Sequence, residues 1–111
     1  MKIVVTEVKQ GVRCISLEGR MDATSAQAGE EEFNTSLTAT NNVIVDLEKV
    51  TFIGSVGIRL LIAGAKLQRK MGGKMVIADP NVTTRWVIKT TGIDQVIPVF
   101  DNIAAALATF A

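Results

Sequence analysis

The sequence predicts an α/β domain in which a β-hairpin precedes strands and helices that alternate along the chain. Residues 2–8 and 12–19 are rich in β-branched side chains and flank the turn-forming Gly11, which favours a hairpin. Residues 42–47 form a continuous apolar segment of strand length, which is typical of a strand covered on both faces. Alternation of strands with helices indicates a mixed sheet with the helices packed against it.

The first helix is expected within residues 21–40. Its first half is acidic, and either Asp22 or Thr24 can accept hydrogen bonds from the free amides of the first turn. Phe33 and Leu37 are four residues apart, so they supply an apolar pair on one helix face.

The second helix is predicted to begin at Ser55, where a strand-like run breaks at Gly54, and to continue to Met71. Gly72 and Gly73 then provide the C-cap. Cations near the end of this helix complement its dipole: Lys66, Arg69 and Lys70. Residues 74–79 are predicted to form the next strand, which ends before Pro80.

The C-terminal third completes the order β-β-α-β-α-β-α-β-α, and residues 1–111 are assigned to one domain. Residues 82–92 are predicted to form a short helix stopped by Gly92. Residues 95–100 are predicted to form a strand in which Pro98 marks an edge or an end. Residues 101–110 are predicted to form a helix capped by either of its first two residues, Asp101 or Asn102.

Charge and hydropathy exclude some partners. Lys and Arg number 12 against 11 Asp and Glu, and phosphate binding needs a clustered positive excess, so direct nucleic-acid binding is not expected. The N-terminus lacks the apolar length and cleavage site of a signal peptide, and no apolar segment approaches the roughly 20 residues that cross a bilayer. The sequence therefore predicts a cytoplasmic protein without membrane insertion.

Missing residue types exclude several chemistries. The chain has no histidine, so neither a Ser-His-Asp nor a Cys-His catalytic system is possible. Cys14 is the only cysteine, so the chain can form neither an intramolecular disulfide nor a Cys-based metal site. We expect Cys14 to be a buried structural thiol. No metal site and no cofactor are predicted, and any metal ligands would have to be carboxylates.

Ser55 is the residue on which the functional prediction depends. A nucleophile elbow needs glycine two residues before the serine and a base; this chain has Ile53 there and no histidine, so no catalytic residue is assigned. No phosphate-binding loop motif is present, although a helix N-terminus with small residues could hold an anion weakly. Serine is also among the best N-cap residues, worth about 1 kcal/mol over alanine, so an N-cap is expected.

A helical wheel divides the second helix into two faces. The face expected to enter the core carries Val56, Leu60, Ala63, Leu67 and Met71. The opposite face carries Ser55 with Ile58, Ile62, Ala65, Lys66 and Arg69. Two isoleucines beside a serine and ringed by cations favour a docking patch; the alternative is that another helix of the domain covers them.

Three other features have simpler interpretations. Asp22 follows a strand and precedes a helix, so it is expected to be a cap that could also share a surface with Ser55. Trp86 is expected to pack in the core or against a helix. The acidic run at residues 30–32 is expected to be solvated.

Two segments resemble a known family. "EGRMDATSA", residues 18–26, resembles the G-x-[LI]-D segment after the second strand of STAS domains, the sulfate transporter and anti-sigma factor antagonist family. "VIVDLEKVTFIGSVGIRLL", residues 43–61, resembles their most distinctive segment: a strand ending in Asp-Leu, a V-x-[FY]-[IM]-D-S-S-G loop, then a helix. The element order extends the resemblance over essentially the whole chain. A free-standing chain of this length looks like the bacterial anti-sigma factor antagonists.

The resemblance implies a regulatory role in a partner-switching pathway of transcription, not an enzyme. A cognate anti-sigma factor that is also a serine kinase would phosphorylate Ser55, and a phosphatase would remove the phosphate. The unphosphorylated form would bind the kinase and free the sigma factor, while phosphorylation would block binding. The partner-binding residues implied are Asp22, Gly54, Ser55, Val56, Ile58 and Ile62.

The chain departs from the family pattern at the loop. Gly54 stands where the family usually has aspartate, and Val56 stands where serine or alanine is common. One interpretation is a divergent kinase. The other is a domain that binds without being phosphorylated, including a STAS module that senses a ligand or nucleotide near Asp22 and Ser55.

Overall fold

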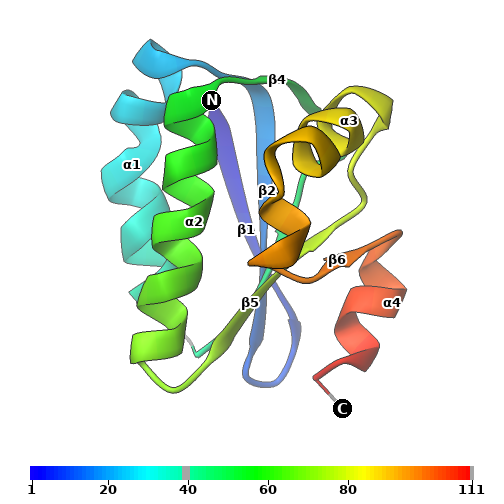
Figure 1. Cartoon of the computed structure of the whole chain (residues 1–111). Coiled ribbons are helices and arrows are strands. Elements are labelled where there is room, and N and C mark those ends of the chain that lie inside the picture. The colour runs from blue at the N-terminus through cyan, green and yellow to red at the C-terminus, as the bar shows by residue number, and fades with distance from the viewer. Residues whose placement is uncertain (39–40, 111) are drawn as a thin grey trace.

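The computed structural model describes residues 1–38 and 41–110, which form a six-stranded mixed sheet with helices on both faces (Figure 1). The strands are β1 (Lys2–Lys9), β2 (Val12–Met21), β3 (Asn42–Asp46), β4 (Val50–Ile53), β5 (Lys74–Ala78) and β6 (Val99–Phe100). The helices are α1 (Ala23–Thr38), α2 (Ser55–Lys70), α3 (Val82–Thr91) and α4 (Ile103–Ala108), with the 3-10 helix η1 (Ile93–Gln95) after α3. The predicted α/β class is confirmed.

The sheet has the order β1-β2-β3-β5-β6, and β4 pairs with the far end of β2. The predicted hairpin of β1 and β2 is antiparallel, and the other strand pairs are parallel. Strand β2 is long enough to pair with two strands in addition to β1, because its residues 13–16 pair with β3 and its residues 19–21 pair with β4. The carboxyl ends of β2 and β4 therefore lie side by side.

The short strand β4 was absent from the predicted order. It has four residues, of which Val50 and Ile53 are buried while Thr51 and Phe52 are exposed. This burial pattern lacks the strict alternation of a half-buried strand, so local sequence gives a weak signal. What makes β4 a strand is its pairing with β2, a neighbour about 30 residues away in sequence.

Two hydrophobic cores fill the space between the layers. Helices α1, α2 and α3 lie on one face of the sheet and α4 lies on the other (Figure 1). Phe33 and Leu37 are fully buried in the larger core, together with Leu61 of α2. Cys14 is buried in the smaller core beneath α4, as predicted, and burial raises the pKa of its thiol.

Glycine and asparagine define the helix ends largely as expected. Gly92 ends α3 in the left-handed conformation, with φ of 77°, and Gly72 follows the C-cap of α2 with φ of 83°. Asn102, rather than Asp101, caps α4 by accepting the Ala105 amide at 2.8 Å. The last two residues of the predicted first helix, 39 and 40, lie outside the described residues.

The strand predicted at residues 95–100 is wrong for most of its length, because only Val99 and Phe100 pair with β5. The amides of Gln95 and Val96 donate instead to carbonyls in the η1 turn, at 3.0 and 2.9 Å. Pro98 has no amide hydrogen to donate to a neighbouring strand. The chain therefore reaches the sheet only for its last two residues.

The prediction that Trp86 packs in the core or against a helix is also wrong, because 68% of its surface is exposed. Helix α3 buries Thr84 and Ile88, and Trp86 lies between them in sequence on the outer side. Val82, one turn earlier, is 88% exposed. In the part of the chain that is described, no helix combines the length and the hydrophobicity needed to span a membrane.

Candidate functional site

The two segments that carry the family resemblance meet at the edge where β2 and β4 end. Met21 pairs with Ile53, and the Gly54 amide donates to the Met21 carbonyl at 3.0 Å. Asp22 directly follows Met21, and Gly54 directly follows Ile53, the residue that pairs with Met21. The parallel sheet thus joins residues that are about 30 positions apart in the sequence.

Asp22 is the N-terminal cap of α1, as predicted. One carboxylate oxygen accepts the Ser25 amide at 2.9 Å, and the other accepts Nε of Arg20 at 3.1 Å. The Ser25 amide, and after it the Arg20 guanidinium, lowers the pKa of the Asp22 carboxyl. The half-buried Asp22 therefore presents a negative charge beside the β4–α2 loop.

Phe52 and Arg20 connect Asp22 to this loop, and sequence reasoning missed both. The Arg20 guanidinium lies 4.4 Å from the centre of the Phe52 ring, which is a cation–π contact. A Cβ added at Gly54 would lie 3.2 Å from the same ring. Glycine before the serine therefore lets Phe52 cover the loop. Recognition of β4 would have revealed this contact, since Arg20 and Phe52 are cross-strand partners.

Ser55 is the first residue of α2 rather than its N-cap, so the predicted cap is wrong. Gly54 occupies the cap position with an extended backbone, and its carbonyl accepts the Ile58 amide at 3.0 Å. The bond from Gly54 to Met21 holds that extended conformation, so Gly54 takes the cap position while the helix begins at Ser55, the predicted first residue. Ser55 is exposed, and within the described residues its hydroxyl makes no hydrogen bond.

Gly57 sets how closely α2 approaches β2. A Cβ at this position would lie 2.8 Å from the Met21 carbonyl oxygen and 2.9 Å from the Met21 Cβ, distances that real contacts do not reach. The second glycine of "GSVG" is therefore required for packing. Together with the first, it holds Ser55 at the end of the sheet.

The buried face of α2 differs from the predicted one. It consists of Gly57, Leu60, Leu61, Gly64, Ala65 and Gln68. Ala63, predicted to be buried, is exposed, whereas Ala65, predicted to face outward, is buried. The predicted face was chosen from the large apolar residues of the helix. The helix instead packs against its neighbours through glycines, since a Cβ at Gly64 would lie 2.9 Å from the Leu37 side chain.

The predicted docking patch is partly covered. Ile58 and Ile62 are both half-buried, and Ile58 packs against the larger core. Val56 is half-buried on the side of α2 that faces α1. The exposed side of α2 carries its cations, Arg59, Lys66, Arg69 and Lys70.

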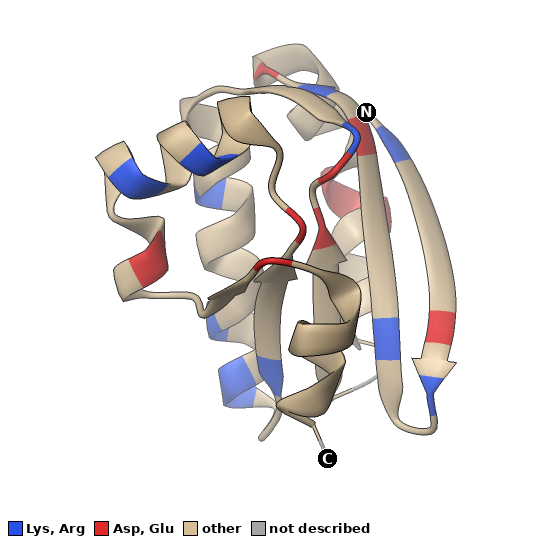
Figure 2. Cartoon of the chain, turned by 90° about the vertical axis from the view of Figure 1, so that its right-hand side faces the viewer, with Lys and Arg blue, Asp and Glu red and all other residues tan. Residues whose placement is uncertain are grey.

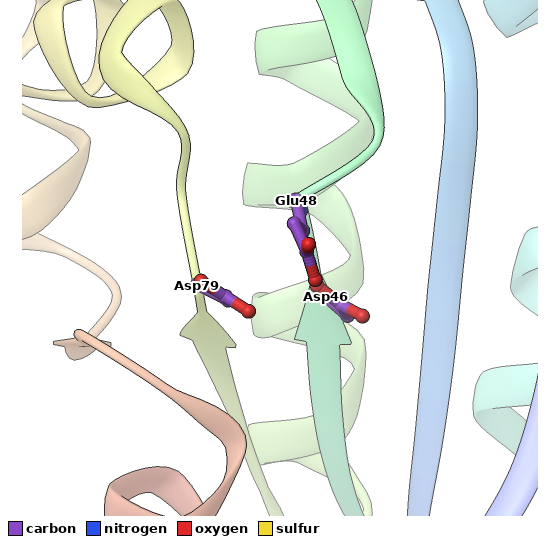
Figure 3. Close-up of side chains that lie close together, drawn as sticks. All are labelled: Asp46, Glu48 and Asp79. Carbon is purple, nitrogen blue, oxygen red and sulfur yellow. The ribbon is translucent and has the colours of Figure 1, made fainter.

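A second cluster, of carboxylates, lies where β3 and β5 end (Figure 3). One oxygen from each of Asp46, Glu48 and Asp79 lies within 4.8 Å of the others. The charge of Asp79 and a hydrogen bond to it, followed by the charge of Asp46, raise the pKa of Glu48. Three oxygen donors suit a hard divalent cation, but nothing else in the described residues points to an ion. The signal in the sequence was an acidic residue after each of two buried strands.

Comparison with known proteins agrees with this architecture. A family model described as the STAS domain matches residues 4–106. The anti-sigma-F factor antagonist RsfB of Mycobacterium tuberculosis is 33% identical over 102 residues, covering 87% of this chain and 80% of RsfB.

Two solved structures have similar sequences and folds. A crystal structure of an anti-sigma factor antagonist from Mycobacterium paratuberculosis superposes with a TM-score of 0.87 at 28% identity, covering 97% of this chain and 92% of that one. An anti-sigma-factor antagonist (STAS) domain protein from Planctomyces limnophilus superposes with a TM-score of 0.84 at 29% identity, covering 98% and 97%. With a family model that covers nearly all of its residues, this chain belongs to the STAS domain family.

Proposed function

We propose that the protein is an anti-sigma factor antagonist, a binding protein rather than an enzyme. Its similarity to RsfB and to the two solved antagonists supports this role. In its unphosphorylated form it binds an anti-sigma factor that is also a serine kinase, and this binding frees the sigma factor. The observation that carries the proposal is the exposed hydroxyl of Ser55, which makes no hydrogen bond within the described residues, at the first position of α2, where Gly54 is bonded to the residue before Asp22.

The proposed partner surface is the one that the family resemblance implies. It comprises Asp22, Gly54, Ser55, Val56, Ile58 and Ile62. A phosphate on Ser55 adds about −1.5 to −2 charges. At a helix N-terminus that charge is favourable within the folded domain, so phosphorylation changes the surface rather than the fold. A strongly hydrated group beside Ile58 and Ile62 then opposes apolar contact with the partner. A phosphatase restores binding.

Gly54 stands where the family usually has an aspartate, so the kinase must recognise another feature of this loop. A Cβ there needs the Phe52 ring to shift by a few tenths of an ångström, and Phe52 is 38% exposed. We infer that the kinase for this protein recognises Phe52 and Asp22 in place of a loop aspartate.

Pull-down of kinase-like anti-sigma factors from the native host tests the proposal. The wild type and Ser55→Ala should retain the kinase, whereas Ser55→Asp should lose it. Ile62→Glu should also abolish binding, while Thr83→Glu, at an exposed position on α3, should not. Thermal unfolding of each variant checks the fold.

Incubation with ATP and the retained kinase should add one phosphate, mapped to Ser55 by mass spectrometry. Equal binding by all variants would refute Ser55 as the switch. Binding without any phosphate transfer would instead leave an interaction domain that stays permanently active. A thermal shift with ATP or GTP alone would favour a nucleotide-sensing module.

A further inference from the structure

The helices α1 and α2 carry charges of opposite sign. Helix α2, from Ser55 to Lys70, contains four cations and no acidic residue, whereas α1 contains three glutamates and no cation. Figure 2 colours the cations blue and the acidic residues red. Solvated surfaces usually intersperse both signs, so a helix with only one sign needs a reason.

The cations of α2 find no acidic partner within the described residues. Two ion pairs are present there, Arg20 with Asp22 and Arg85 with Asp101, and neither involves α2. Of the four cations, Arg69 donates to the Val96 carbonyl at 3.4 Å. The remaining cations are exposed and form no ion pair within the described residues: Lys66, Lys70 and Arg59, which shares a hollow between α1 and α2 with Glu30.

These three residues, here called the cationic stripe, lie on one line along α2. Spacings of seven and four residues place them within about 40° of each other around the helix. Ser55 lies one turn before Arg59 at the start of the same line, and Ile62 lies beside it between Arg59 and Lys66. The stripe thus continues the partner surface proposed above.

We propose that the cationic stripe receives an acidic surface of the anti-sigma factor, in which carboxylates flank an apolar side chain that contacts Ile62. This inference rests on the proposed function and names the chemistry of the partner. Carboxylates on a protein fit better than other anions do. The chain's net charge of +1 attracts nucleic acid poorly, and two half-buried isoleucines offer too little apolar surface to enter a membrane.

The same charges explain how phosphorylation acts on the contact. A phosphate on Ser55 has the sign of the partner's carboxylates, so it repels them. It also lies four residues before Arg59, the spacing at which opposite charges pair on a helix. The phosphate therefore competes with the partner for the first cation of the stripe.

A titration monitored by nuclear magnetic resonance tests the stripe without a natural partner. The probe is a helical peptide with leucine and glutamate on one face, and its control has glutamine in place of glutamate. The acidic peptide should shift the amides of Arg59, Ile62, Lys66 and Lys70, and the shifts should vanish between about 0.05 and 0.5 M salt. Equal shifts with the glutamine peptide, or shifts elsewhere on the surface, would overturn the inference. Tighter binding to phosphatidylglycerol vesicles or to duplex DNA than to the acidic peptide would also overturn the inference.

The second arm uses the anti-sigma factor that the wild type retains. Lys66→Glu with Lys70→Glu should weaken its binding at least about tenfold at low salt, whereas Lys89→Glu on α3 should change it less than about twofold. Unchanged affinity in the double variant would overturn the inference and leave the proposed function intact. If the wild type retains no anti-sigma factor, the proposed function fails, and the peptide titration decides the inference by itself.

Discussion

At the scale of single residues, two carboxylates near the strand ends have opposite effects on stability. The pKa of Asp22 is lowered, so Asp22 stabilises the fold above its unfolded pKa, and this effect is lost as the pH falls through the folded pKa. The pKa of Glu48 is raised, so its favourable contribution is present below its unfolded pKa and is lost as the pH rises through the folded value. Ionised Glu48 therefore opposes folding at neutral pH.

Glu48→Gln should raise the melting temperature at pH 7, because it removes one charge from a cluster of three carboxylates. The amide can still donate a hydrogen bond to Asp79. Near pH 3 the gain should disappear, since Glu48 is then protonated in the folded and unfolded states alike. Thermal unfolding followed by circular dichroism at both pH values measures this. Glu31→Gln, exposed on α1, is the control, and an equal gain there would contradict the explanation.

At the scale of elements, one asparagine joins helix α3 to the β3–β4 turn. The side-chain oxygen of Asn81 accepts the Thr84 amide at 3.0 Å, which caps α3. Its side-chain nitrogen donates to the carbonyls of Glu48 and Val50 at 3.0 and 2.6 Å. The cap was missed although asparagine directly before a helix is a preferred N-cap. The donor bonds were not predictable, because they depend on a turn more than 30 residues earlier in the sequence.

Asn81→Ala should lower the free energy of unfolding by about 1–3 kcal/mol, since it removes the cap and leaves the part-buried Val50 carbonyl without this donor. Asn81→Asp keeps the cap but loses both donor bonds, so it should retain only part of the stability. Asn102→Ala removes the cap of the short helix α4 and no further bond, and it is the matched control. Urea unfolding measures all three, and a loss at Asn102 as large as that at Asn81 would contradict the role of the turn.

Elements were predictable where local patterns and packing agree. The hairpin, β3, β5 and α3 follow from β-branched runs, apolar runs and glycine stops. The β4 strand was not predicted, and the N-cap of α2 and the extent of β6 were predicted wrongly, all for a common reason. In each case a backbone bond to a distant segment decides the conformation: β4 with β2, Gly54 with Met21, and Val99 with β5.

At the scale of the whole molecule, the only tryptophan reports on the surface rather than the core. Trp86 is exposed on α3, so its native fluorescence should lie close to that of the unfolded chain, and acrylamide should quench it readily. Trp86→Phe should change the free energy of unfolding by less than about 0.5 kcal/mol. A strongly blue-shifted, protected emission in the native state would contradict this placement.

The sequence by itself determined the class of the fold, the family and the position of Ser55, because these follow from short patterns in hydrophobicity and in residue type. The tertiary structure decided which residues surround Ser55 and which face of α2 is free. Glycines allow the helix to approach β2 and α1 at particular points, and parallel pairing brings Asp22, Arg20 and Phe52 to the same edge. Such contacts depend on backbone separations in space, which a pattern of side chains along one segment does not specify.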